Sequence, residues 1–326
     1  MHINFKKVPM PMGGMALGLA ALGILYKQVT VMYWLCGAAA LFCLLLLVGR
    51  VITDFDGFKS DFANPIFASV SAAGLMAVIQ LSTYVEPFAH FLAFIMWACA
   101  VVAHFSVMAL VTKRFIFNFS LKNLFPTFFI TYVGIIVASV TSPFFGMERL
   151  GQFTFWFGFI AYMILLVAIT YRYVKIPAPE PARPLFCIYA APMSLSLVGY
   201  ISVFEHPSLL FVAGMAILAQ LLLLLVLTRI PSLLALGFYP SFAAMTFPFV
   251  ISATGLIKTT QLLAAFTSLN VGFLNVLISI EMMLAAVMVL YVFVRYLNWM
   301  GKNVFEVTAL RAFFAKVNDS KVLDEE

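Results

Sequence analysis

The chain is built from long apolar runs that charged residues seldom interrupt. A helix needs roughly 20 mostly apolar residues to cross the hydrocarbon core of a bilayer. Because lipid offers the backbone no hydrogen bonds, such a run must satisfy its own amides and carbonyls as a helix. The pattern therefore predicts an all-α integral membrane protein with ten transmembrane helices, over residues 9–26, 30–49, 64–84, 87–112, 124–142, 150–171, 185–204, 208–228, 232–257 and 266–296.

The composition leads to the same class. Of 326 residues, 64% are hydrophobic and 10% are charged, whereas an average soluble domain is about 45–50% apolar and about 25% charged. This excludes a cytosolic enzyme, a secreted disulfide scaffold and a disordered binding protein. The net charge of +6 is dispersed between the apolar runs, so no nucleic-acid partner is indicated. The cysteines stand singly with no C-x-x-C spacing, so we expect no disulfide, metal or cofactor; they are Cys36, Cys43, Cys99 and Cys187.

The basic residues are distributed unequally between the two ends of the predicted spans. Sixteen of the 19 lysines and arginines fall in the N-terminal segment, the connections after even-numbered spans, and the C-terminal segment. The other side holds only Lys27, Arg149 and Lys258. Cytoplasmic loops carry the basic excess in membrane proteins. We therefore expect a multi-pass protein of the cell membrane with both termini in the cytoplasm.

The two ends of the chain need separate interpretation. The first apolar run follows Lys6-Lys7 as in a signal peptide, but it has no convincing cleavage site, and we interpret it as a span. Residues 1–297 are predicted to form one transmembrane domain, and residues 298–326 a cytoplasmic tail. Apolar and charged residues alternate over 303–316 in a pattern typical of an amphipathic helix on the inner leaflet or on the cytoplasmic loops.

Odd-numbered and even-numbered spans differ in composition. The even spans are rich in leucine, whereas the odd spans are rich in small and hydroxyl residues and carry proline near their start or inside, at intervals of roughly 60 residues. Small residues permit close helix packing or line a water-filled path. We therefore predict five helical hairpins, with an inner ring of five proline-kinked helices around a pore and an outer ring of five facing lipid. The prolines are Pro9, Pro11, Pro65, Pro126, Pro192, Pro240 and Pro248.

Short motifs on the odd spans resemble the tellurite-resistance/dicarboxylate transporter family, which includes bacterial tellurite-resistance proteins and plant guard-cell slow anion channels. The resemblance extends from about Pro9 to Leu297. It implies five hairpins around a central pore, one pore per protomer, assembly as a homotrimer, and passage of small inorganic or organic anions. Some family members export sulfite or carry malate. The motifs are Gly14-Met15-Ala16-Leu17-Gly18-Leu19-Ala20-Ala21-Leu22, Asn64-Pro65, Phe125-Pro126-Thr127-Phe128, Ala191-Pro192 with Tyr200, and Thr246-Phe247-Pro248.

The leading functional hypothesis is an anion channel. The odd spans contain no charged residue before their short outer connections, so an anion would meet hydroxyl groups, backbone dipoles and aromatic edges. Weak sites favour conduction because an ion must also leave them. The predicted pore-lining residues are Gly14, Gly18, Ser69, Thr127, Ser194 and Thr246, and the predicted kinks along the pore are Pro65, Pro126, Pro192 and Pro248.

Phe247 is the predicted gate. It directly precedes Pro248, where helical geometry is disfavoured, and Thr246-Phe247-Pro248 resembles the motif that carries the pore-plugging phenylalanine of the family. A ring in a narrow apolar pore blocks ions sterically and excludes water. The alternative for Phe247 is an ordinary packing role.

A proton-coupled carrier or exporter of C4-dicarboxylate (malate), sulfite or tellurite is the alternative function. It rests on Glu281, a carboxyl group near the middle of the last span, where charge is costly. Glu281 also departs from the family pattern, in which the nearby position is polar and uncharged, and Ala16 stands where the bacterial proteins have proline. A structural hydrogen-bonding role for Glu281 is the other interpretation, and His104 has the same two interpretations.

No H-E-x-x-H, G-x-S-x-G or paired catalytic aspartates occur, so an enzyme is not expected.

Overall fold

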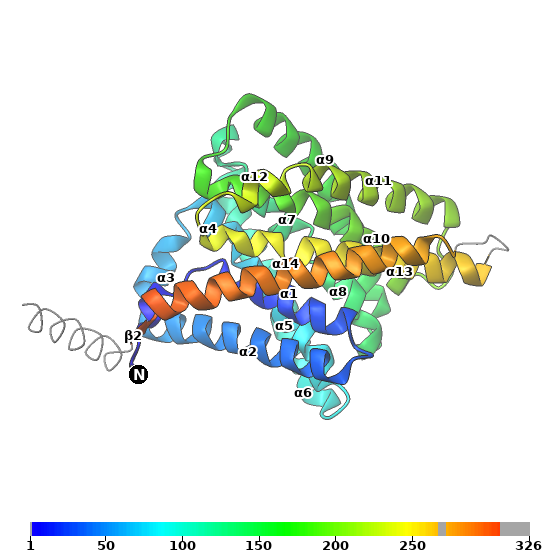
Figure 1. Cartoon of the computed structure of the whole chain (residues 1–326), viewed down its shortest axis with the longest axis horizontal. Coiled ribbons are helices and arrows are strands. Elements are labelled where there is room, and N and C mark those ends of the chain that lie inside the picture. Colours follow the sequence, from blue (N-terminus) through cyan, green and yellow to red (C-terminus); the bar gives the residue numbers. More distant parts are fainter. Residues whose placement is uncertain (1, 267–271, 307–326) are drawn as a thin grey trace, which may run out of the picture.

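Helices account for almost all of the chain that the structure, a computed structural model, describes, which is residues 2–266 and 272–306. Most long helices run along one common direction in Figure 1, and the N-terminus and β2 lie at the same end. We call this end the basic end, because Lys6, Lys7 and Arg50 lie there. In order, the elements are β1 (His2–Ile3), η1 (Phe5–Lys7), α1 (Met12–Leu25), α2 (Thr30–Thr53), α3 (Phe55–Asp61), α4 (Pro65–Val70), α5 (Ala72–Val85), α6 (His90–Val111), η2 (Thr112–Ile116), η3 (Leu121–Asn123), α7 (Thr127–Tyr132), α8 (Ile136–Thr141), η4 (Ser142–Phe145), α9 (Glu148–Lys175), η5 (Glu180–Ala190), α10 (Ala191–Val203), α11 (Leu209–Leu227), α12 (Ile230–Leu234), η6 (Pro240–Met245), α13 (Phe247–Phe266), α14 (Leu274–Asn303) and β2 (Phe305–Glu306).

Eight helical stretches of the described chain are long and apolar enough to cross a membrane. They agree with the prediction of an all-α membrane protein. Two shorter apolar stretches, Met12–Leu25 and Ile136–Phe145, fall in the first and fifth predicted spans. The count of ten spans therefore stays a prediction for these two. The eight stretches are Thr30–Thr53, Pro65–Val85, His90–Ile116, Glu148–Lys175, Glu180–Val203, Leu209–Leu227, Pro240–Phe266 and Leu274–Asn303.

The spanning stretches form two classes by burial. The buried share of the 18-residue apolar window is 67%, 83% and 72% in the proline-bearing stretches Pro65–Val85, Glu180–Val203 and Pro240–Phe266, whereas it is 28–39% in the other five. Helix α1 packs against α5 and α13, α10 packs against α8 and α13, and α5 contacts α8. Small side chains explain this difference, because they let neighbouring backbones approach closely.

The prolines lie at helix starts. Pro65 is the first residue of α4, with the Asn64 side chain accepting from the Ile66 amide at 2.9 Å. Pro126 directly precedes α7, and Pro192 and Pro248 are the second residues of α10 and α13. Proline suits the first turn because its missing N–H would have no intrahelical acceptor there.

The interruptions within the third and fifth spans lie elsewhere. Helices α4 and α5 are separated by Ser71, and α7 and α8 are separated around Gly134. A Cβ on Gly134 would lie 2.1 Å from the Ile130 carbonyl oxygen and 2.5 Å from Met76 Sδ, so only glycine fits this break. Proline therefore marks where these inner helices begin. The break between α7 and α8 occurs where Gly134 packs too closely against its neighbours for any side chain.

The last two spans extend further than their apolar runs. Helix α13 continues to Phe266, so Lys258 lies within it, although the sequence placed this residue in a connection. Helix α14 runs from Leu274 to Asn303 and so passes residue 297, because polar residues continue a helix where it leaves the apolar layer. Of the predicted amphipathic segment 303–316, residues 307–316 lie outside the described residues, as does the rest of the tail to 326.

Two short strands join the N-terminal segment to the residues that follow α14. In β1 and β2, His2 pairs with Glu306 and Ile3 with Phe305, in antiparallel orientation. The Asn4 amide also donates to the Val304 carbonyl at 2.8 Å. The segment that follows β1 is therefore fixed beside the end of α14.

Candidate functional site

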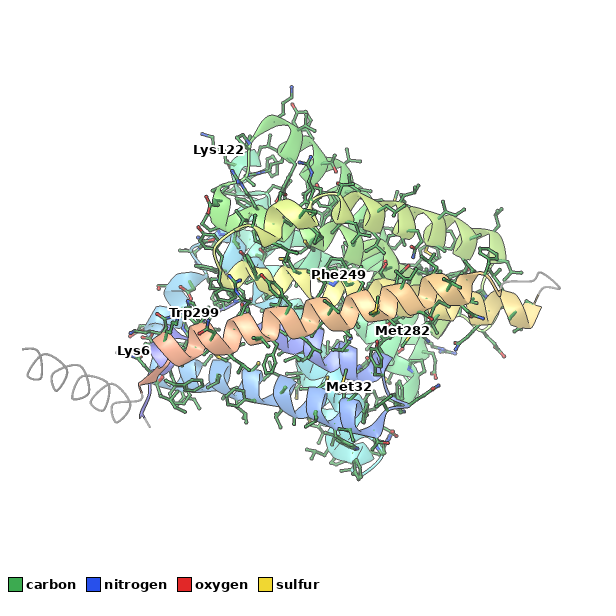
Figure 2. All side chains as sticks on the ribbon, viewed as in Figure 1. Lys6, Met32, Lys122, Phe249, Met282 and Trp299 are labelled. Carbon is green, nitrogen blue, oxygen red and sulfur yellow. The ribbon has the colours of Figure 1, made fainter. Side chains whose placement is uncertain are left out.

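A cavity of about 450 Å³ opens at the basic end. It lies between the N-terminal segment, the start of α4, the start of η5 and the start of η6 at Tyr239–Ser241. Its charged lining residues are Lys6, Lys7, Arg50 and Asp61, and Lys6 is labelled at this end in Figure 2. We call it the basic vestibule. Three basic side chains and one acidic side chain give it a net positive charge.

Arg50 fixes the wall of the basic vestibule. Its Nη1 donates to the Val8 carbonyl at 2.7 Å, and its Nη2 forms an ion pair with Asp61 at 2.6 Å. The guanidinium is almost buried, whereas Lys6 and Lys7 are exposed. Arg50 therefore holds the N-terminal segment in place, and the two lysines supply the accessible charge.

A second, narrower cavity of about 50 Å³ continues from the vestibule. The two share Pro11, Val70, Leu185 and Ser241. This central cavity lies between α1, the α4–α5 and α7–α8 segments, the η5–α10 segment and the η6–α13 segment, which are the five inner segments. Ser241 is its one polar side chain among the described residues. An apolar constriction of this kind resists hydrated ions because it disfavours water.

Phe247 lines the central cavity at the junction of η6 and α13. Phe247 is 6% exposed and contributes to the lining from the α13 side. The junction is held by Thr246, whose Oγ1 donates to the Ala243 carbonyl at 2.7 Å and to the Gly14 carbonyl at 3.3 Å. The neighbouring Phe249, labelled near the centre of Figure 2, is fully buried but is not part of the cavity lining.

The other predicted pore residues fall into two groups. Gly14, Pro192 and Pro248 line the central cavity with Phe247. Gly18, Ser69, Thr127, Ser194, Thr246, Pro65 and Pro126 are outside its lining.

The hydroxyl groups of the second group join neighbouring helices. Ser69 Oγ donates to Thr127 Oγ1 at 2.6 Å between α4 and α7, and Thr131 Oγ1 donates to the Ser69 carbonyl at 2.9 Å. Ser194 Oγ donates to the Ala190 carbonyl one turn earlier in its own segment at 3.0 Å, and to Ser252 Oγ of α13 at 3.5 Å. Buried hydroxyls with such partners stabilise the packing of the inner helices.

Several lining residues were not predicted from the sequence. They include Met76, Phe129, Val133, Leu185, Ile188 and Leu195. All are apolar residues in a chain that is 64% hydrophobic, so no sequence signal separates them from core positions.

Lys258 places a positive charge inside α13. Its Nζ donates to Ser202 Oγ of α10 at 3.2 Å, and the side chain is half-buried. It lies eleven residues beyond Phe247 along α13, which rises about 1.5 Å per residue. A fixed cation therefore stands between two inner helices, on the far side of Phe247 from the basic vestibule.

Glu281 of α14 points into the bundle. It is 3% exposed, and Gln220 of α11 and Ser252 of α13 face its carboxyl group. Neither carboxyl oxygen has a hydrogen bond of good geometry within the described residues. Ser252 in turn accepts from Ser194 Oγ of α10 at 3.5 Å. Glu281 thus faces the inner helix α13 directly, at Ser252.

His104 of α6 has a structural partner. Its Nε2 donates to the Thr131 carbonyl at 2.9 Å, and the ring is fully buried. Thr131 lies just before the break between α7 and α8, where backbone carbonyls lose their usual helical donors. His104 therefore satisfies a carbonyl group that the break leaves without its helical partner.

These features define a class: a helical membrane protein in which a small apolar cavity adjoins a positively charged vestibule, as expected for anion transport. The family model described as voltage-dependent anion channel (SLAC1) matches residues 1–297. The chain belongs to this family, which confirms the resemblance to the tellurite-resistance/dicarboxylate transporter family. The family consists of membrane anion transport proteins and not of enzymes. No curated protein matches the chain.

Proposed function

We propose that this protein is an anion channel whose central passage is closed by the ring of Phe247. The observation that supports this most is the position of Phe247 in a 50 Å³ apolar cavity that continues directly from a 450 Å³ vestibule. A constriction of this size, lined almost wholly by apolar groups, does not admit a hydrated anion. Removal of the Phe247 ring would therefore enlarge the central cavity.

Charge favours anions at both sides of Phe247. Lys6 and Lys7 raise the positive potential of the basic vestibule and so concentrate anions there, whereas the charge of Arg50 is paired with Asp61. Lys258 supplies a second attractive charge beyond Phe247. The central cavity itself has no charged lining residue in the described chain, so an anion binds only weakly between these points and can leave.

The proposed architecture has ten spans in five hairpins, with one pore per protomer. The contacts α1–α5, α5–α8, α8–α10, α10–α13 and α13–α1 support a closed inner ring, and the low burial of the leucine-rich stretches supports an outer ring facing lipid. Both termini are proposed to be cytoplasmic, since the basic residues gather at their end. Assembly as a homotrimer in the cell membrane follows from the family resemblance.

A proton-coupled carrier or exporter of malate, sulfite or tellurite is the second candidate. The observation that favours it is Glu281, a buried carboxyl group that faces Ser252 of α13, and Ser252 in turn accepts a hydrogen bond from Ser194 of α10. A charged carboxylate at mid-membrane costs about 2.5–3.5 kcal/mol on insertion scales. Glu281 is therefore a group that can carry a proton, in addition to its packing role.

Recording from purified protein in proteoliposomes distinguishes the two candidates. At equal pH on both sides, voltage steps are applied with chloride, nitrate, sulfite, malate or tellurite as the anion. The channel predicts a steady voltage-driven current with at least one anion. Electroneutral flux that requires a pH gradient, with no voltage-driven current, would show a carrier instead.

A further inference from the structure

A third cavity lies on the outer side of η5, away from the central passage. Its volume is about 290 Å³, and Tyr173, Arg183, Phe186, Arg229 and Ser232 contribute to its lining. The cavity is near the basic end, because Pro181 and Ala182, next to Arg183, line the basic vestibule. It brings together the end of α9, the start of η5 and the turn between α11 and α12 (Figure 1).

The outer cavity and the central cavity are lined by different faces of η5. In a 3₁₀-helix, residues three apart lie on one face. Ala182, Leu185 and Ile188 line the vestibule or the central cavity, whereas Arg183 and Phe186 line the outer cavity. A ligand in the outer cavity therefore does not share the route of the transported anion.

The two arginines of this outer cavity have no acidic partner. Neither Arg183 nor Arg229 forms an ion pair with a described residue. Arg229 lies over the Phe186 ring, with Cζ 6.0 Å from the ring centroid. The nearest acidic residue in sequence, Glu180, accepts instead from the Tyr239 hydroxyl at 2.8 Å. Two guanidinium groups thus line one cavity without a salt bridge to a described residue.

A third polar group points to a ligand with acceptor oxygens. The Tyr173 hydroxyl is buried and has no hydrogen-bond partner in the described structure. Its ring is held by Phe186, Tyr189 and the guanidinium of Arg172, whose Cζ lies 5.1 Å from the ring centroid. A buried phenol without a partner loses hydrogen-bond energy, which an incoming acceptor would restore.

The rim of the cavity continues into the lipid-facing surface. Val174 of α9 and Leu224 and Leu225 of α11 are 77%, 57% and 45% exposed. Further along the same two helices, an apolar groove of about 420 Å³ lies between Phe159 and Met163 of α9 and Leu218 of α11. Acyl chains therefore have an apolar surface beside the arginines.

We propose that this outer cavity binds the phosphate head group of an anionic phospholipid. Arginine pairs phosphate oxygens through two parallel N–H donors, and basic pockets at the ends of membrane helices recognise anionic head groups in general. In this proposal the Tyr173 side chain, which lines the cavity, turns its buried hydroxyl toward the phosphate and donates a further hydrogen bond. Free phosphate shares the head-group chemistry, but the apolar rim favours the lipid.

Thermal unfolding of the full-length protein in detergent tests the proposal. Phosphatidylglycerol should raise the unfolding midpoint, whereas phosphatidylcholine and an equal concentration of inorganic phosphate should not. In the variant Arg183→Gln/Arg229→Gln the apparent affinity for phosphatidylglycerol should fall on the order of 30-fold, since each basic residue near a membrane surface contributes about 1 kcal/mol. The matched control is Lys113→Gln/Arg114→Gln, which removes two charges from the exposed η2 segment and should leave the affinity unchanged.

Three outcomes would overturn the assignment. The double variant could retain the full lipid effect, the control could lose it equally, or inorganic phosphate could stabilise as much as the lipid, which would indicate an ion site. Tyr173→Phe provides a second test that keeps both charges and the packing. It should lower the phosphatidylglycerol affinity several-fold, and native mass spectrometry should detect fewer retained phosphatidylglycerol molecules than in wild type. An unchanged affinity and lipid count in this variant would equally contradict the proposal.

Discussion

A Cβ added to Gly18 of α1 would lie 2.3 Å from Oγ1 of Thr246, the residue before Phe247. It would also lie 3.2 Å from the Phe247 amide nitrogen. The backbone of α1 at Gly18 is therefore in direct contact with Thr246 at the η6–α13 junction, and no side chain fits at position 18 without a shift. The position of the Phe247 ring depends on this contact, because Thr246 also hydrogen-bonds to the Gly14 carbonyl.

Gly18→Ala should disturb this junction. Overpacking of a close contact costs about 1–3 kcal/mol, so we expect a lower thermal unfolding midpoint and an altered anion current. Gly214→Ala on α11 is the control, since nothing lies within 4 Å of its added Cβ and alanine favours a helix. Equal midpoints and currents for both variants and the wild type would show that α1 does not constrain the junction.

Lys258→Gln should reduce anion current. The half-buried ammonium group is screened by salt much less than a surface charge, so we expect a several-fold loss that persists at high ionic strength. Lys27→Gln, at an exposed lysine between α1 and α2, should have little effect at physiological salt. Currents normalised to reconstituted protein measure both, and a current unchanged in Lys258→Gln would remove this residue from the anion pathway.

Glu281→Gln should preserve both fold and voltage-driven current. The amide keeps a donor and an acceptor for Gln220 and Ser252, which face the carboxyl group. Size-exclusion profiles and currents at equal pH on both sides check this expectation. If the variant stays assembled but loses a pH-driven uptake that the wild type shows, Glu281 carries protons and the carrier function gains support.

Cysteine labelling should divide the charged positions into two classes. We expect single cysteines at positions 27 and 149 to react with an impermeant reagent in intact cells, and those at 59, 114 and 183 to react only after permeabilisation. The background lacks Cys36, Cys43, Cys99 and Cys187, all of which are free thiols. Labelling of position 114 from outside would contradict the proposed topology of ten spans with cytoplasmic termini.

The fold was largely predictable because lipid imposes one rule on every span. Apolar runs locate the helices, and the small residues of the inner segments anticipate their greater burial. The end of the ninth span was not predicted correctly, because Lys258 ends the apolar run in the sequence whereas α13 continues to Phe266. The interruption at Gly134 depends on contacts with Ile130 and Met76, which no local pattern in the sequence indicates.

The candidate site was predictable only where a motif marked it. Phe247 and Pro248 stood out through Thr246-Phe247-Pro248, and both line the central cavity. Hydroxyl residues such as Ser69 looked suited to an anion path, but their oxygens are engaged between helices. Apolar lining residues such as Leu185 cannot be distinguished by type from the many apolar core residues, because only the fold determines which of them face the passage.

The most direct test of the central claim is the anion current of Phe247→Ala, normalised to folded protein in the membrane. Phe249→Ala is the matched control, since this buried ring of the same helix is outside the cavity lining. Both substitutions cost about 3–5 kcal/mol where the ring is fully packed, and Phe247→Leu offers a milder change at the gate. The gate predicts a current well above wild type for Phe247→Ala, an intermediate current for Phe247→Leu, and no increase for Phe249→Ala. A current from well-folded Phe247→Ala that is equal to or below that of wild type would contradict the account.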